Sequence, residues 1–178
     1  ELRLDGDRDL VVVAVQPTPG QTHVGQPGAV GCTLLAQPGD RLDVGRHEGA
    51  DARQFRGLLR IVAIGGDSHD SIAKTERDFG SVDILVNNAG IQHVSPVEEF
   101  PIEKWDAILA INLSSAFHTI RAAIPGMKKR KWGRVIHISS VLGLGGKLGR
   151  NVYSATKAAL IGMARSSALD LGPFGVTV

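Results

Sequence analysis

One tyrosine and one lysine, four residues apart, form the pair in this sequence with the clearest chemical use. Tyr153 and Lys157 lie in the stretch 151–171, which contains good helix formers, has Asn151 as its predicted N-cap and is followed by Gly172-Pro173. On a helix, residues four apart lie on one face. An ammonium close to a phenol favours the phenolate, so the phenol exchanges protons more readily near neutral pH. The pair therefore suits proton transfer, although the same spacing also occurs in ordinary solvated helix pairs.

Small polar residues follow two predicted strands. The β-branched run after Gly133 predicts a buried strand over 134–139, with Ser140 at its carboxyl end. The apolar run 83–86 predicts a second strand, which leads into Asn87-Asn-Ala-Gly90. Ligands of open α/β sheets bind at the carboxyl ends of the strands. Small residues at such an edge let a flat cofactor approach the backbone closely.

An asparagine interrupts the apolar face of a long predicted helix. The helix starts at Pro101 and runs to about Met127, and Asn112 falls within its apolar stripe. An amide without partners on this face would cost a few kcal/mol. We therefore predict that Asn112 has a functional or water-binding role, and the alternative is that it only marks a kink in the helix.

The remaining pattern alternates strands and helices. Strands are predicted over 10–15, 58–64 and 175–178, and a short helix over 71–79 is capped by Asp70 or Ser71. Alternating strands and helices imply an α/β fold with a parallel sheet and right-handed crossovers. His137 lies in the middle of its predicted strand and is interpreted as a packed core histidine.

Composition excludes several classes of function. The chain has 178 residues, 43% of them hydrophobic and 21% charged, which is ordinary for a globular domain. A formal net charge of +2 is too small to predict binding to nucleic acid or to an anionic membrane. The single cysteine, Cys32, and the spacing of the six histidines predict no metal site. No apolar run approaches transmembrane length, so we expect a cytoplasmic protein without a membrane partner.

Four of these motifs together carry a family resemblance. Asn87-Asn-Ala-Gly90, Asn112, Ser140 and the Tyr153–Lys157 pair resemble, in order and spacing, the short-chain dehydrogenase/reductase family over residues 81–178. Within the family, residues 91–106 are most similar to bacterial D-3-hydroxybutyrate dehydrogenases. The general core is also similar to 3-oxoacyl-acyl-carrier-protein reductases.

The resemblance implies both a fold and a reaction. The fold is a Rossmann-like, doubly wound parallel sheet in a single domain over 1–178. We expect this domain to be a fragment, irregular at its N-terminus and incomplete at its C-terminus. The reaction is hydride transfer between NAD or NADP and a small molecule, a secondary alcohol or ketone. The resemblance further implies a homo-oligomer formed through helices 102–126 and 151–171.

The resemblance also assigns the catalytic roles. Tyr153 is the expected general acid/base, and Lys157 assists it and holds the nicotinamide ribose. Ser140 is expected to hydrogen-bond the substrate oxygen, and Asn112 to hold a water that connects Lys157 to solvent. Cofactor contacts are expected from Asn88, Ala89 and Gly90 as well as from Tyr153 and Lys157.

Substrate recognition follows the hydroxybutyrate enzymes only in part. In those enzymes a glutamine, a histidine and a lysine bind the substrate carboxylate. Gln92 matches the glutamine, and Arg150 stands at the lysine position and keeps its charge. The histidine position is Leu142, which cannot donate a hydrogen bond. The expected substrate is therefore a 3-hydroxybutyrate-like or 3-oxoacyl compound, contacted by Gln92, Ser140, Arg150 and Tyr153.

Residues 1–66 depart from the family pattern. The glycine-rich loop Thr-Gly-x-x-x-Gly-x-Gly, expected after strand 10–15, is not found, and prolines interrupt the region where a helix should follow. Either this region is divergent and rich in loops, or it was translated out of frame. Cofactor binding by this chain is accordingly expected to be weak or absent. The alternative to an active oxidoreductase is an inactive remnant that serves only in association.

Overall fold

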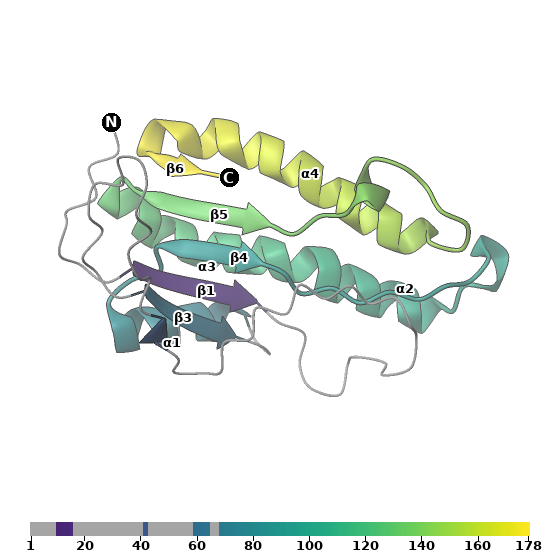
Figure 1. The fold of residues 1–178 in the computed structure, drawn as a ribbon, viewed down its shortest axis with the longest axis horizontal. Helices are drawn as coiled ribbons and strands as arrows, with labels where there is room; N and C mark the ends of the chain where they lie inside the picture. Colours follow the sequence, from purple (N-terminus) through teal and green to yellow (C-terminus); the bar gives the residue numbers. More distant parts are fainter. Residues whose placement is uncertain (1–9, 16–40, 43–58, 65–67) are drawn as a thin grey trace.

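Five strands of one sheet run parallel in the computed structural model, which describes residues 10–15, 41–42, 59–64 and 68–178 (Figure 1). The strands are β1 (Leu10–Val15), β2 (Arg41–Leu42), β3 (Leu59–Ile64), β4 (Ile84–Asn87), β5 (Gly133–His137) and β6 (Val176–Thr177). Their order across the sheet is β2-β3-β1-β4-β5-β6. The two-residue strand β2 is antiparallel to β3. The predicted α/β fold with a parallel sheet is confirmed.

The side on which successive strands join the sheet changes at β1. β1 pairs with β3 on one side and with β4 on the other, so the sheet has its switch point between β1 and β4. A doubly wound sheet ordered 3-2-1-4-5-6 would have another parallel strand between β1 and β3. Here β3 pairs directly with β1. The glycine-rich turn and helix implied after β1 fall on residues 16–40, which lie outside the described residues.

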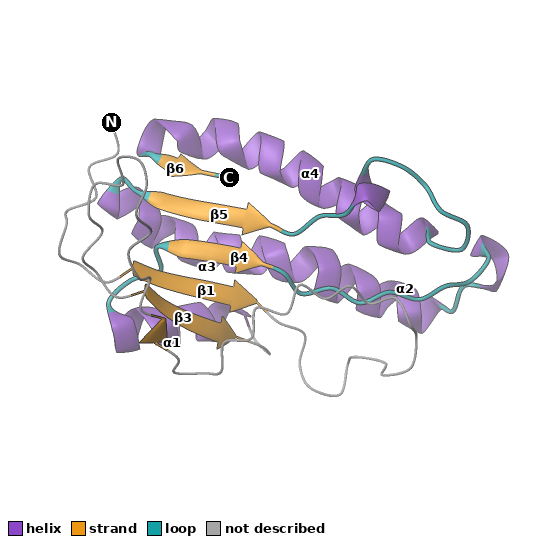
Figure 2. Cartoon of the chain, viewed as in Figure 1, coloured by secondary structure: helices purple, strands orange, loops and turns teal. Residues whose placement is uncertain are grey.

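The described helices form one layer on the sheet (Figure 2). They are α1 (Ser68–Phe79), α2 (Ile102–Leu109), a π-helical turn (Ala110–Ser114), α3 (Ser115–Arg130) and α4 (Asn151–Leu171), with 3₁₀ turns at Val97–Glu99, Val141–Gly143 and Gly172–Phe174. From β3 to β4, β5 and β6 the strands advance in one direction, and right-handed crossovers therefore place α1, α3 and α4 on one face. On the opposite face, Ile136 and Ile138 of the β5 segment are 46% and 37% exposed.

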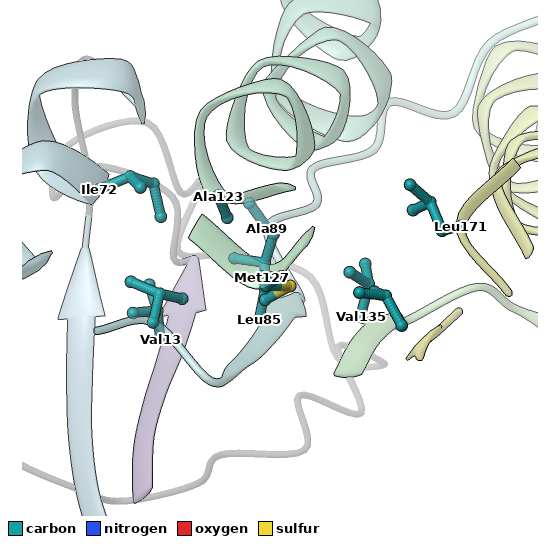
Figure 3. Packing of buried hydrophobic residues seen from close by; sticks show 10 residues of the cluster. Val13, Ile72, Leu85, Ala89, Ala123, Met127, Val135 and Leu171 are labelled. Carbon is teal, nitrogen blue, oxygen red and sulfur yellow. The ribbon is translucent and has the colours of Figure 1, made fainter. Parts of the chain in front are cut away.

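The core lies between this helical layer and the sheet (Figure 3). Strand residues Val13, Leu85 and Val135 point toward Ala123 and Met127 of α3, and all five side chains are buried. They alternate with the outward residues of each strand, as the period-2 pattern of a strand requires. Ile72 of α1 and Leu171 of α4 extend the same cluster to its two ends.

Several element boundaries differ from the sequence predictions by one to three residues, among them those of α1 and β5. α1 begins at Ser68 rather than at residue 71, so Asp70 lies in its first turn, where a negative charge favours a helix N-terminus. β5 ends at His137, two residues before the predicted end. The ladder makes one more bond, from Ile138 N to Asn87 O at 2.9 Å, after which Ser139 turns toward α4.

The continuous helical segment Ile102–Arg130 is 29 residues long and apolar enough by composition to cross a membrane. This result differs from the sequence expectation that no segment approaches such a length. The segment packs on α1, β4 and β5 and carries the buried polar residues Asn112 and Thr119. The segment is therefore a helix packed on the sheet of this α/β fold.

A buried carboxylate pairs with the end of α3. Asp83 is fully buried; its Oδ2 accepts a hydrogen bond from Ser81 Oγ at 2.9 Å, and Arg130 Nε lies 3.6 Å from its Oδ1. Arg130 Nη2 also donates to Val82 O at 2.7 Å. Arg130→Met is expected to lower the free energy of unfolding by about 3 kcal/mol, because it removes the cation beside a buried charge. Urea unfolding measures this loss. The exposed neighbour substitution Lys129→Met should change stability by no more than about 0.5 kcal/mol, and equal losses in the two variants would contradict the role of Arg130.

Candidate active site

Lys157 is the buried cation at the carboxyl end of β5. Its side chain is 3% exposed, and its Nζ donates a hydrogen bond to Ile138 O at 2.6 Å. The backbone carbonyl of the same lysine accepts from Ser139 Oγ at 2.8 Å. The residues that follow β5 thus hold Lys157 by both its side chain and its backbone. Burial lowers the pKa of the Lys157 ammonium.

Tyr153 lies one helical turn before Lys157, as the spacing predicts. The Lys157 Nζ is 5.7 Å from the centroid of the Tyr153 ring. Thr156 Oγ1 donates to Tyr153 O at 2.8 Å within the same turn of α4. Tyr153 is half-buried, so its side chain is partly open to solvent. The ammonium therefore lies within cation–π distance of the Tyr153 ring.

Asn112 occupies the π-helical turn between α2 and α3 and is 1% exposed. Its Oδ1 accepts from Ile91 N at 2.8 Å, and its Nδ2 donates to Ile91 O at 2.9 Å and to Thr156 Oγ1 at 3.2 Å. The amide thus connects the loop after β4 to α4. Both of its N–H groups are used, so a water could bind this side chain only through Oδ1. A π turn at such a position is common at functional sites.

The Asn-Asn-Ala-Gly turn after β4 lies next to Lys157 and Asn112. A Cβ added to Gly90 would lie 3.4 Å from Lys157 Nζ and 3.8 Å from Asn112 Oδ1. Ala89 is buried, whereas Asn88 is partly exposed. The structure therefore brings Gly90, Asn112, Tyr153 and Lys157 together from three separate segments of the chain.

Ser140 stands at the base of the turn Val141–Gly143 rather than at the end of the strand itself. Its Oγ accepts from Leu142 N at 3.2 Å and caps this turn. The turn packs tightly on α4, because a Cβ added to Gly143 would lie 2.9 Å from Lys157 C, Lys157 O and Ser139 Oγ. The position of Ser140 is thus fixed against the Lys157 turn of α4.

Gly143→Ala is expected to push this turn away from α4 and to displace Ser140. Overpacking of this kind costs about 1–3 kcal/mol of stability. The free energy of unfolding and the amide NMR signals of residues 138–143 measure the effect. Gly146→Ala is the matched control, because a Cβ added to Gly146 meets nothing within 4 Å. Equal stability of the two variants would contradict the close packing at Gly143.

The two predicted carboxylate-binding residues differ in exposure. Gln92 is exposed, directly after the Ile91 backbone that Asn112 holds. Arg150 is mostly buried, and its Nη1 is shielded from solvent and has no hydrogen-bond partner among the described residues. Arg150 also occupies the N-cap position of α4, so the prediction of Asn151 as N-cap is wrong. Asn151 is the first helical residue, and its side chain accepts from Val152 N at 2.7 Å.

The sequence motifs did not predict a polar network that Thr119, Asn87 and His137 form on the helix-covered side of the sheet. Thr119 Oγ1 donates to Asn87 Oδ1 at 2.7 Å, and Asn87 Nδ2 lies 3.5 Å from His137 Nδ1. Burial, and secondly the charge of Lys157, lower the pKa of His137. The available signal was the position of Thr119, seven residues after Asn112 and so on the same helix face. His137 therefore belongs to a polar network rather than being only packed in the core.

A family model for short chain dehydrogenases matches residues 51–178. The chain belongs to the short-chain dehydrogenase family. The match begins before residue 81, so the family resemblance extends further toward the N-terminus than the sequence motifs indicated. The Rossmann-like fold expected for the family is confirmed by the two solved structures described below.

The relatives include dehydrogenases and a reductase. The chain is 45% identical over 143 residues to D-beta-hydroxybutyrate dehydrogenase of Cupriavidus necator. The aligned residues make up 80% of this chain and 51% of that protein. It is 39% identical over 123 residues to the 3-oxoacyl-acyl-carrier-protein reductase of Escherichia coli (strain K12), covering 69% of the chain and 50% of that protein. The chain thus spans about half the length of the curated relatives it matches.

Two solved structures are similar to the described fold. One is an NAD⁺-bound xylitol dehydrogenase, with a TM-score of 0.62, 29% identity and coverage of 67% of this chain and 49% of that one. The other is a gluconate 5-dehydrogenase from Burkholderia cenocepacia in complex with NADP and tartrate. Its TM-score is 0.62 at 30% identity, covering 65% of this chain and 48% of that one.

Proposed function

We propose that this short-chain dehydrogenase chain carries the active-site residues of an NAD(P)-dependent oxidoreductase that acts on a secondary alcohol or ketone. The observation that carries the proposal is the meeting of Lys157 Nζ with Gly90, Asn112 and the Tyr153 ring at the carboxyl ends of β4 and β5. A buried ammonium, a phenol and a small open turn at this edge suit hydride-transfer chemistry on a nicotinamide.

The residues present fit such a cofactor. Lys157 has three N–H donors, and in the described part of the chain one of them is used, on Ile138 O. The other two can donate to the hydroxyls of a nicotinamide ribose. Gly90 has no side chain toward Lys157 Nζ, which leaves the approach open. The bound cofactor would supply the hydride acceptor or donor, and similar proteins have been solved with NAD⁺ and with NADP.

Tyr153 would transfer the proton of the substrate hydroxyl, because it is the single phenol of the chain and its ring lies beside the Lys157 ammonium. Ser140 would donate a hydrogen bond to the substrate oxygen as charge develops on it. Its own Oγ already accepts from Leu142 N, so its O–H proton is free to point at the substrate. Asn112 would fix the Ile91 backbone and Thr156, and would hold through Oδ1 a water that links Lys157 to solvent.

A small hydroxy acid is the substrate that the surrounding residues favour. Within the described part of the chain, Arg150 Nη1 is shielded from solvent and unpartnered, and a carboxylate satisfies a buried guanidinium donor of this kind. Gln92 would add a neutral donor to the substrate carboxylate. The relatives named for D-beta-hydroxybutyrate support a 3-hydroxybutyrate-like substrate. Leu142 supplies no donor, so recognition of the acid would be weaker than with a third polar contact.

Turnover of three alcohols tests the proposal. Reduction of millimolar NAD or NADP is followed with D-3-hydroxybutyrate, with a 3-hydroxyacyl thioester and with butan-2-ol, which lacks the carboxylate. We expect the chain to oxidise D-3-hydroxybutyrate. In Arg150→Leu, the rate with D-3-hydroxybutyrate should fall more than the rate with butan-2-ol. Preference for the thioester would instead favour a reductase of the 3-oxoacyl type, as in the E. coli relative. No turnover of any of them would favour an inactive remnant.

Association through the helical layer forms part of the same proposal. The outer faces of the helices carry exposed apolar side chains, among them Trp105, Phe117 and Leu169, which are 42%, 53% and 81% exposed. These residues lie on helices 102–126 and 151–171, through which the family resemblance implies a homo-oligomer. Light scattering of the purified chain tests this expectation, and a monomer at all concentrations would contradict it.

A further inference from the structure

His137 lies on the helix-covered face of the sheet. Its strand neighbours Ile136 and Ile138 point to the opposite, partly exposed face, and side chains alternate along a strand. The Nε2 atom of His137 is shielded from solvent and has no hydrogen-bond partner in the described part of the chain. His137 is therefore a titratable group enclosed between β5 and the helices, directly before the carbonyl that holds Lys157.

The hydrogen bonds around the imidazole define its tautomer. Thr119 Oγ1 lies 2.7 Å from Asn87 Oδ1 and 3.0 Å from both Ser115 O and Ala116 O. Its single proton is assigned to the shortest of these contacts, on Asn87 Oδ1, which turns the Nδ2 of that amide toward His137 Nδ1. With the amide in this orientation, its N–H can only donate across the 3.5 Å contact, so Nδ1 is the acceptor. The proton of the neutral ring then resides on Nε2.

One charged group acts on this imidazole among the described residues. From α4 it is the ammonium of Lys157. Asn87 of β4, which contacts the ring, and Thr119 of α3, which contacts Asn87, are neutral. Lys157 Nζ is held by the carbonyl of Ile138, the residue that follows His137. Protonation of His137 would place a second positive charge beside this ammonium in a poorly solvated region, where like charges repel strongly.

We propose that His137 is a positioning residue for Lys157. Its neutral imidazole leaves the ammonium bound to Ile138 O, and its protonation in acid displaces the ammonium from that carbonyl. The inference rests on the proposed function in one respect, because Lys157 is the group proposed to hold the nicotinamide ribose. Acid would then weaken cofactor binding before the chain unfolds.

The direction of the titration follows from burial. Burial first, and the charge of Lys157 second, keep the pKa of His137 below its ordinary value of 6.5, so the ring is neutral at pH 7. Below pH 6.5 the unfolded chain takes up this proton and the folded chain does not, until the pH reaches the folded pKa. The stability of the folded chain therefore falls as the pH drops through this window. His137→Asn, which cannot titrate, should lose less stability over the same window.

NMR of the labelled 178-residue chain tests the tautomer and the coupling. The imidazole signals of His137 are those missing from His137→Asn. We expect the Nε2–H tautomer at pH 7, a titration midpoint below 6.5, and a higher midpoint in Lys157→Met than in the charge-retaining Lys157→Arg. An Nδ1–H tautomer, a midpoint at or above 6.5, or equal midpoints in the two Lys157 variants would overturn the proposal.

The signals of the Lys157 εCH₂ group give the reciprocal measurement. In the unmodified chain they should shift at the midpoint of His137, and this shift should be absent from His137→Asn. A histidine with a merely structural role would leave them unchanged, and unchanged signals would overturn the proposal even if the Lys157 variants fail to fold. Neither measurement requires cofactor, so a chain that binds no NADH would refute the proposed function without refuting the coupling.

Discussion

Replacement of Tyr153 by phenylalanine is expected to lower turnover of the alcohol substrate by about 10²–10⁴-fold, because general acid/base catalysis contributes this factor. Phenylalanine keeps the ring beside Lys157 Nζ and the backbone carbonyl that Thr156 binds, so the fold of α4 should persist. Only the exchangeable proton is lost. The initial rate of NAD(P)H formation with D-3-hydroxybutyrate measures the effect, and the NMR spectrum of the variant confirms its fold.

Ser154→Ala is the control for this substitution. Ser154 is the next residue on α4, and its Oγ is shielded without a hydrogen-bond partner in the described part of the chain. Its removal should leave turnover close to that of the unmodified chain. A loss of less than about tenfold in Tyr153→Phe, with turnover still measurable, would assign the proton transfer to another group.

The second large effect is expected at Asn112. Asn112→Leu keeps the volume of the side chain but leaves the N–H and C=O of Ile91 without their partner. Each unsatisfied backbone group costs about 1–3 kcal/mol, so the free energy of unfolding should fall by about 2–6 kcal/mol. Urea unfolding measures the loss. The loop that carries Gly90 and Gln92 should also exchange its amide protons faster, because Asn112 holds the Ile91 backbone between them.

Asn151→Ala provides the matched asparagine control. Asn151 is exposed and accepts one hydrogen bond, from Val152 N, at the start of α4. Its loss should cost about 1 kcal/mol or less. If Asn112→Leu and Asn151→Ala destabilise the chain equally, the bonds to Ile91 do not hold the loop.

Local signals were sufficient to predict the element that carries the tyrosine and lysine. α4 runs from Asn151 to Leu171, because helix formers fill the segment and Gly172-Pro173 ends it. The strand at 10–15 was predictable for the same reason, and so was the strand predicted at 83–86 and found at 84–87, since each is a short apolar run between turn residues. The Tyr153–Lys157 spacing then placed both side chains on one face.

Long-range bonds determined what the sequence could not predict. Asn112 was identified because a polar amide interrupts an apolar stripe, but its partners Ile91 and Thr156 are 21 and 44 residues away. The π turn around it had no local signal. His137 was interpreted as a core residue, because its partner Asn87 is 50 residues away and is brought level with it by strand pairing. The place of β3 beside β1 likewise depends on pairing across the sheet.

Titration of NADH fluorescence against the chain and against Lys157→Met tests most directly whether the Lys157 site binds a nicotinamide cofactor. We expect weak but saturable binding by the chain at millimolar cofactor, equal binding by the exposed-lysine control Lys129→Met, and a clear loss in Lys157→Met. Binding that is unchanged in Lys157→Met, or no saturation with the unmodified chain, would contradict the assignment of this site to the cofactor.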